Sequence, residues 1–171
     1  MGRGALALVK KREVVSDTGP LISLERLPDG HQWMQELYTG IVMPPSVTDE
    51  LLAEGHEDLD KYEQHYGVEA LLQTSPLQGS SFPPEIAHLH PDERDAIRLA
   101  LALDLELLVE EEEGRQAAEQ LGIPYSGIAA QLLIAVQEGV LPKAKGRRQL
   151  RILLNRGRIN QRVFDTVRPQ L

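Results

Sequence analysis

Short apolar runs alternate with amphipathic stretches along most of the chain. The β-branched run at 13–17 ends in Asp17, just before a Thr-Gly-Pro sequence, and this pattern predicts a buried strand that ends at Asp17. Further strands are predicted at 40–43, 106–109 and 123–125, with a weaker strand pattern at 69–74. Short strands separated by longer segments of this kind are typical of α/β proteins.

Apolar side chains between these runs recur every three or four residues, which is the spacing of a helix with one buried face. Helices are predicted at 21–27, 31–38, 46–52, 57–67, 91–103, 115–121, 128–138, 143–155 and 160–167. Pro91 opens one of them, since proline fits the first helical turn. Ser46 is predicted to N-cap another, with Asp49 at the spacing of a capping box. Because strands alternate with helices, we expect a parallel sheet covered on both faces.

The length of the chain, 171 residues, suits a single domain spanning 1–171. The chain contains no cysteine, which excludes a disulfide scaffold, a cysteine-ligated metal site and a thiol nucleophile. No apolar run approaches the roughly 18–20 residues that span a membrane. The apolar segment 5–9 is too short for a signal-peptide core. We therefore expect a cytoplasmic protein without a membrane partner.

The formal net charge of −8 hides a strong asymmetry along the chain. Residues 141–171 contain nine basic residues and one acid, whereas residues 1–140 contain nine basic and 25 acidic residues. The basic segment also carries apolar residues at helical spacing, so we expect a folded, basic helical extension at about 141–171. Two interpretations of this basic surface remain open, contact with RNA phosphates and ion pairs with the acidic body or a second protomer. Its candidate nucleic-acid contacts are Lys143, Lys145, Arg147, Arg148 and Arg151.

Acidic residues end the predicted strands or begin the predicted helices. Asp17, Glu110 and Glu111 lie at strand ends, and Glu50 and the acids at 92, 93 and 95 lie in first helical turns. In an open parallel sheet the ligand crevice lies outside the carboxyl ends of the strands, so four segments can bring carboxylates to one crevice. Clustered carboxylates need a cation, and oxygen ligands without cysteine favour Mg²⁺ or Mn²⁺. Such an ion can activate water to attack a phosphodiester.

Each acid also has a purely structural interpretation. The helix dipole favours acids in a first helical turn, and the run at 110–113 is typical of a solvated surface. Other chemistries lack the residues that they need. The five histidines show no metal-ligand spacing, the serines lack a nucleophile-elbow sequence, and there is no glycine-rich phosphate loop.

Four segments resemble the motifs of PIN domains, in the same order along the chain. The segment 14–22, VVSDTGPLI, resembles an opening strand that ends in Asp-Thr, and 41–51, IVMPPSVTDEL, resembles a second motif that leads to Glu-Leu. The segment 92–100, DERDAIRLA, resembles a third motif, an acid before an Ala-Ile-x-x-Ala helix. The segment 107–117, LLVEEEEGRQA, is similar to a branch in which Asp-Asp is followed by Arg four residues later. The resemblance covers about 13–160 and includes VapC-type toxin ribonucleases and a related uncharacterised bacterial branch.

The resemblance implies a set of site residues. The implied catalytic residues are Asp17, Glu50, Asp95, Glu110 and Glu111, and the implied metal ligands are Asp17, Glu50, Asp95 and Glu110. Supporting roles fall on Thr18, Glu93 and Arg115. The family mostly has Asp where this chain has Glu110 and Glu111, and the extra methylene of Glu changes the position of a ligand carboxylate.

The resemblance also implies a fold and a function. The fold is a three-layer α/β/α sandwich with a central, mostly parallel sheet of four to five strands. The function is Mg²⁺- or Mn²⁺-dependent cleavage of RNA, often as the toxin of a toxin–antitoxin pair and often as a homodimer. Two alternatives remain open, a catalytically impaired PIN-like protein that acts as a binding or regulatory partner, and an α/β module similar to a response-regulator receiver. A receiver would have a second acid beside Asp17 and a late lysine, but no lysine lies between Lys61 and Lys143.

Overall fold

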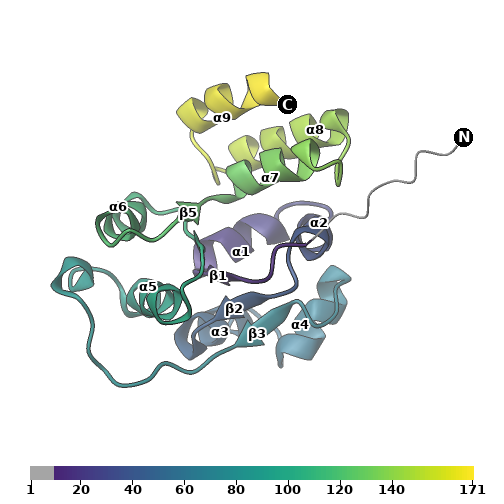
Figure 1. Ribbon diagram of the computed structural model, residues 1–171. Coiled ribbons are helices and arrows are strands. Elements are labelled where there is room, and N and C mark those ends of the chain that lie inside the picture. Colours follow the sequence, from purple (N-terminus) through teal and green to yellow (C-terminus); the bar gives the residue numbers. More distant parts are fainter. Residues whose placement is uncertain (1–9) are drawn as a thin grey trace, which may run out of the picture.

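A parallel five-stranded sheet forms the centre of the protein in the computed structural model, which describes residues 10–171 (Figure 1). The apolar segment 5–9, considered above as a signal-peptide core, lies outside the described residues. The strands are β1 (Val14–Ser16), β2 (Ile41–Met43), β3 (Leu72–Thr74), β4 (Leu107–Leu108) and β5 (Tyr125–Ser126), in the order β3-β2-β1-β4-β5. All neighbouring strands pair in parallel.

The middle of the sheet is buried on both faces, which explains its uninterrupted apolar and β-branched sequence. On β1, Val14 pairs with Ile41 of β2, and Val15 pairs with Leu107 of β4. These four side chains are fully buried. Strand β1 therefore carries its carboxyl end, and Asp17 directly after it, into the middle of one edge of the sheet.

Helices cover both faces of the sheet, which confirms the predicted α/β/α sandwich. They are α1 (Thr18–Glu25), α2 (Gly30–Leu37), α3 (Pro45–Leu52), α4 (Leu59–Tyr66), α5 (Pro91–Leu103), α6 (Glu112–Gln120), α7 (Ile128–Gln137), α8 (Lys143–Asn155) and α9 (Gln161–Val167), with 3₁₀ turns at Pro84–Ile86 and Arg168–Gln170. Right-handed crossovers put α1 to α4 on one face and α5 and α6 on the other. The chain reverses direction between β1 and β4, where open α/β sheets bind their ligands. Across residues 10–171, no helix is long and apolar enough to cross a membrane.

Three predicted helix starts are wrong. Helix α1 begins at Thr18, three residues before its predicted start. Ser46 does not N-cap α3, and Asp49 does not form a capping box with it, because the helix begins one residue earlier, at Pro45, with Pro44 as its N-cap. The hydroxyl of Ser46 instead donates a hydrogen bond to Oδ2 of Asp95 at 2.8 Å. Helix α6 begins at Glu112, three residues before the predicted start.

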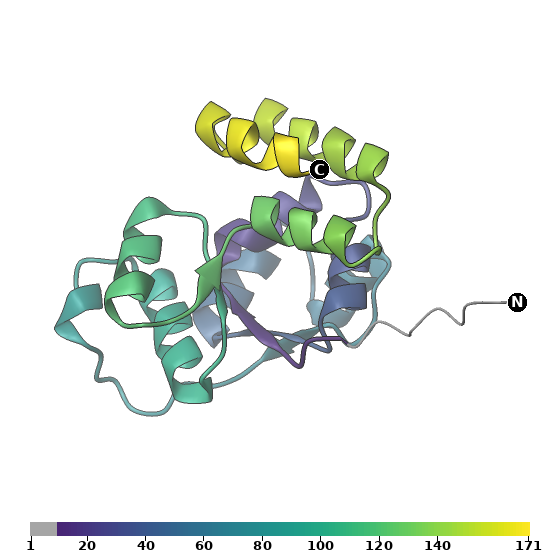
Figure 2. The same cartoon turned by 45° about the horizontal axis from the view of Figure 1, so that its top comes forward.

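The basic segment folds as two helices that pack on the body of the protein. Helices α8 and α9 contact each other and α7, and Figures 1 and 2 show them as the outermost layer beyond α7. Leu150 and Leu153 of α8 are fully buried. The indole N–H of Trp33, on α2, donates a hydrogen bond to Oε1 of the buried Gln149 at 2.9 Å. The extension is therefore joined to the body by apolar packing and by buried hydrogen bonds.

Candidate functional site

Asp17 lies at the point where the chain leaves β1 and begins α1. Its backbone is extended and occupies the N-cap position of α1. The residue is 4% exposed, and within residues 10–171 its Oδ1 atom has no hydrogen-bond partner. Buried polar atoms are almost always hydrogen-bonded in folded proteins, so this oxygen has an unmet need for a donor or a cation.

Three more carboxylates surround Asp17. The pKa of Asp17 is raised to about 7, mainly by burial and in addition by the charges of Asp92, Glu93 and Glu50, whereas the backbone N–H of Thr18 lowers it. The two α5 acids and Glu50 of α3 therefore lie close enough to Asp17 to act on its charge. We call Asp17, Glu50, Asp92 and Glu93 the acidic cluster.

Glu50 is held toward this cluster by Thr18. The hydroxyl of Thr18 donates a hydrogen bond to Oε2 of Glu50 at 2.8 Å. Partial loss of hydration raises the pKa of Glu50, the Thr18 hydroxyl lowers it, and Asp92 raises it through both a side-chain hydrogen bond and its charge. Glu50 thus retains a proton more readily than an isolated carboxyl group in the metal-free protein.

Glu93 sits in the first turn of α5, where the start of α6 approaches it. The backbone N–H of His90 donates to its Oε2 atom at 3.1 Å. A Cβ atom at Gly114 would lie 3.9 Å from Oε1 of Glu93 and only 2.8 Å from Cγ2 of Val109. Glycine at 114 is therefore what allows α6 to pack this closely beside the cluster.

Asp95 does not join the acidic cluster. Its carboxylate accepts hydrogen bonds from Ser46 at 2.8 Å and from the guanidinium of Arg98 at 3.2 Å. Asp92, Glu93 and Glu50 are the charges that act on the pKa of Asp17, and Asp95 is not among them. The implied metal-ligand role of Asp95 therefore lacks the geometry expected for it, and Glu93, implied as a supporting residue, lies beside Asp17 instead.

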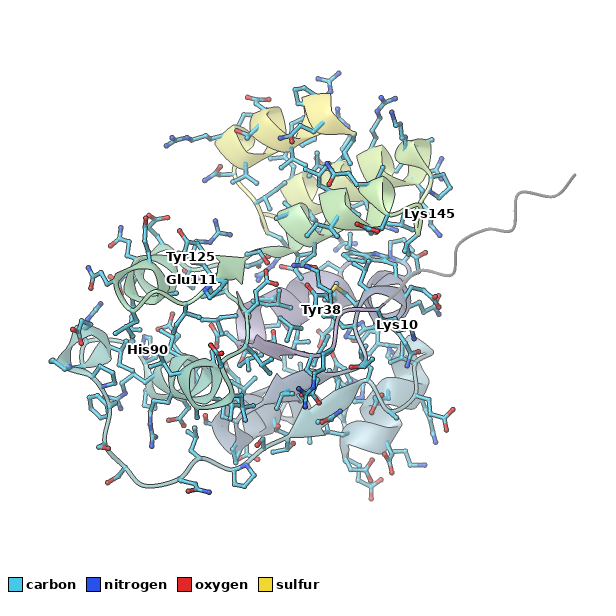
Figure 3. The ribbon with its side chains drawn as sticks, in the orientation of Figure 1. Lys10, Tyr38, His90, Glu111, Tyr125 and Lys145 are labelled. Atoms are coloured by element: carbon cyan, nitrogen blue, oxygen red, sulfur yellow. The ribbon has the colours of Figure 1, made fainter. Side chains whose placement is uncertain are left out.

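Glu110 also has other partners. One carboxylate oxygen accepts hydrogen bonds from Ser23 at 2.6 Å and from Arg158 at 3.3 Å, and the other accepts from the N–H of Ile128 at 3.3 Å. Burial raises the pKa of Glu110, and these three donors together with Arg115 lower it. Glu110 is thus neutralised by the C-terminal extension. Glu111 is exposed at the N-cap of α6, where Figure 3 labels it.

Arg115 and two of the five basic candidates in the extension have structural partners. Nε of Arg115 donates to the carbonyl of Val109 at 3.2 Å. Lys145 forms an ion pair with Asp29, and Arg147 donates to the carbonyl of Leu171 at 3.0 Å. Arg151 lies over the ring of Phe164, Arg148 is exposed on α8, and Lys143 is the first residue of that helix.

The donor atoms of the acidic cluster suit a hard divalent cation, although its side chains do not already enclose one. Within residues 10–171, no three His, Asp or Glu side chains have the geometry of a complete metal site. The cluster nevertheless offers only oxygen ligands, and one of them, Oδ1 of Asp17, is buried without a partner. Oxygen ligands of this kind match Mg²⁺ and Mn²⁺. The residues that would hold such an ion are Asp17, Glu50, Asp92 and Glu93.

Sequence reasoning missed Asp92. The sequence places Asp92 among the first-turn acids that can reach the crevice, but the resemblance assigns it no role, and its partners in the fold are not evident from its neighbours in the chain. The signal that could have found it is its place one residue before Glu93 at the start of a helix that packs on β1 and β4. Both acids therefore lie at the sheet edge that carries Asp17.

Comparisons with known proteins agree with this architecture. A family model described as a PIN domain matches residues 13–170. A solved structure of a PilT N-terminus domain protein from the hyperthermophilic archaeon Sulfolobus solfataricus P2 is 19% identical, with a TM-score of 0.50. The similarity covers 70% of this chain and 89% of that one, and at this identity it concerns the fold alone. No curated protein matches the chain significantly.

Proposed function

The chain belongs to the PIN domain family, a nuclease fold family whose members generally use divalent metal ions, and on this premise we propose that it is a metal-dependent ribonuclease. The observation that supports this proposal most strongly is Asp17, a buried carboxylate with an unpartnered oxygen and three further acids around it. Burying these carboxylates together destabilises the metal-free protein, and a bound cation would remove most of that cost.

We assign the metal ligands to the acidic cluster, with Thr18 holding Glu50 in place through its hydroxyl. A bound Mg²⁺ or Mn²⁺ ion would neutralise charge on the phosphate and lower the pKa of a water molecule. Asp17 would bind the ion through Oδ1, the oxygen that has no hydrogen-bond partner within residues 10–171. The oxygen that leaves phosphorus would take its proton from bulk water, because Glu50 and Asp92 are ionised when they hold the cation.

The first test is cleavage of labelled single-stranded and structured RNAs. We expect cleavage with Mn²⁺ or Mg²⁺ and none in EDTA. Glu93→Gln should lower the rate roughly 10- to 100-fold, since small displacements of a ligand cost about that much. Asp95→Asn is the matched control on the same helix turn and should change the rate less than about threefold, because its carboxylate binds Ser46 and Arg98 in a partly exposed pair.

Two outcomes would contradict this assignment. If Asp95→Asn lowers the cleavage rate more than Glu93→Gln does, the metal ligand on α5 is Asp95 rather than Glu93. Intact RNA in both metals, combined with no uptake of Mn²⁺ by calorimetry, would instead favour a catalytically impaired PIN-like protein. The observation that favours this second candidate is the engagement of Glu110 with Arg158, which removes one implied ligand from the site.

The biological setting is a separate proposal that follows from the family resemblance. We propose a toxin that is restrained by an antitoxin protein and that forms a homodimer. We expect a small reading frame directly beside this gene. Its product should co-purify with this protein and inhibit cleavage. A monomeric mass by light scattering at high concentration would contradict the homodimer.

A further inference from the structure

A groove of about 760 Å³ lies between α6, β5 and the start of α7 on one side and α9 with its preceding loop on the other. Three arginines, Arg115, Arg158 and Arg162, line it together with Tyr125. Two acids, Glu110 and Glu112, also line the groove. Glu110 is neutralised by Arg158, so the arginines outweigh the acids.

The groove adjoins the acidic cluster through Arg158. The guanidinium of Arg158 donates to the carbonyl of Gly19 at 3.0 Å, two residues after Asp17 in the chain. Its contact with Glu110 brings the wall of the groove to the same carboxyl edge of the sheet. The groove and the acidic cluster therefore lie at the same edge of the sheet.

Two side chains in the groove are available to a ligand. Arg162 is exposed, and among residues 10–171 its guanidinium makes no hydrogen bond or ion pair. Tyr125 is 36% exposed on β5, the edge strand of the sheet, and Figure 3 labels it near Glu111. The other two arginines are held by the protein, since Arg115 donates to Val109 and Arg158 to Ser23, Gly19 and Glu110.

We propose that this groove binds the single-stranded RNA segment next to the bond that is cleaved, with a base stacked on Tyr125 and a phosphate bound by Arg162. The inference rests on the proposed ribonuclease function and names the surface that would position its substrate. An aromatic platform beside a positively charged groove is the combination that binds single strands irrespective of sequence. The volume is in the range of clefts that hold small-molecule ligands, which suits one or two nucleotides of a single strand.

The basic outer face of α8 is the other surface that could bind RNA. It carries positive charge but has no exposed aromatic ring. Arg148, Arg151 and Arg168 gather there around Phe164. The ring of Phe164 is 4% exposed, and Arg151 and Arg168 lie over it. This face therefore offers charge without an aromatic surface for a base.

The test measures binding rather than cleavage. Fluorescence anisotropy with a 5′-labelled, unstructured 12-nucleotide RNA in EDTA gives the dissociation constant of the full-length protein. We expect Arg162→Ala to weaken binding about fivefold and to reduce the slope of log K against log salt by about 0.7. Tyr125→Ala should weaken binding roughly tenfold, and Tyr125→Phe, which keeps the ring, less than twofold.

Arg148→Ala is the matched control, since Arg148 is also exposed on the helical extension and also has no ion pair or side-chain hydrogen bond within the described chain. It should change binding less than twofold. An equal or larger loss in Arg148→Ala would place RNA on α8 and overturn the inference. Absence of RNA binding by the unaltered protein would overturn it as well.

Cleavage assays on the same variants separate the two proposals. If the unaltered protein cleaves RNA but Arg162→Ala and Tyr125→Ala bind it normally, the groove inference fails and the ribonuclease function stands. If both variants lose binding but no metal supports cleavage, the groove stands and the ribonuclease function fails. Unchanged thermal unfolding of the variants is expected, because both side chains are exposed.

Discussion

Asp17→Asn is expected to reduce metal-dependent RNA cleavage roughly 1000-fold, equivalent to about 4 kcal/mol of activation free energy, and at the same time to stabilise the metal-free fold. The loss of activity follows from removing the charge of the most buried member of the acidic cluster. The gain in stability follows from the same change, since Asn keeps the shape of the side chain and its acceptor oxygen but carries no charge into the interior.

The stabilisation of the metal-free protein by Asp17→Asn should increase with pH. The pKa of Asp17 is raised from 3.8 to about 7 by folding, so between about pH 4 and pH 7 the native protein holds a proton that the unfolded chain has lost. The free energy of unfolding of the unaltered protein therefore falls as pH rises through this window. The stabilising effect of Asp17→Asn should be absent below pH 4 and greatest above pH 7, where its upper limit is roughly 4 kcal/mol.

Urea unfolding of both proteins at pH 4 and pH 8, in EDTA, measures this difference. Comparing the two proteins at each pH removes the contribution of all other titrating groups. Added Mn²⁺ should raise the urea midpoint of the unaltered protein, because the cation binds only its folded state, and should leave the midpoint of Asp17→Asn nearly unchanged. A variant that is less stable than the parent at pH 8 would mean that the Asp17 carboxylate has a stabilising partner.

The second large effect is expected at Arg158. Arg158→Ala should lower the free energy of unfolding by about 3 kcal/mol, because it leaves Glu110 buried without its cation. It also removes hydrogen bonds to Ser23 at 2.9 Å and to Gly19 at 3.0 Å. Trp33 is the single tryptophan and bonds to Gln149 of α8, so its fluorescence reports unfolding where the extension meets the body.

A double-mutant cycle isolates the buried charge. In a Glu110→Gln background, Arg158→Ala should cost only about 1 kcal/mol, since no ionised group is left unpaired. Arg156→Ala is the control in the same loop, because Arg156 is exposed, and it should be within about 0.5 kcal/mol of the parent. Equal costs for Arg158→Ala in the two backgrounds would show that the hydrogen bonds, rather than the ion pair, hold the loop.

The local pattern of the sequence predicted most of the fold. Strand β1 was recognisable because its β-branched run ends at Asp17, and α5 because Pro91 begins a long apolar repeat. Each feature is contained within a few neighbouring residues. The exact helix starts do not follow from the local pattern. At α3, Pro45 fits the first helical turn as well as Ser46 fits an N-cap, and the hydroxyl of Ser46 found a partner 49 residues away.

The site was predictable only where it depends on local position. Asp17 follows a strand end and Glu50 lies near a helix start, so their place at the carboxyl edge of the sheet follows from these boundaries. The choice between Glu93 and Asp95 depends on helix rotation. Glu93 shares a stripe with Ile97 and Ala100, which are buried in the core, whereas the motif match alone favoured Asp95.

Other partners are distant in the sequence and left no local signal. Arg158 lies 48 residues from Glu110. Lys145 reaches Asp29, and Arg147 reaches Leu171. Some basic residues that the sequence predicts as RNA contacts therefore form contacts within the protein instead.

The contact between Glu110 and Arg158 also has a consequence for biosynthesis. The acidic cluster is complete once the ribosome has made the first 93 residues, but the cation that compensates Glu110 is made much later. Until residue 158 leaves the ribosome, a nascent chain that packs β4 against β1 must bury the Glu110 carboxylate without its ion pair to Arg158 or keep that region open. Products of premature termination would therefore stay partly unfolded, and cellular proteases would remove them preferentially.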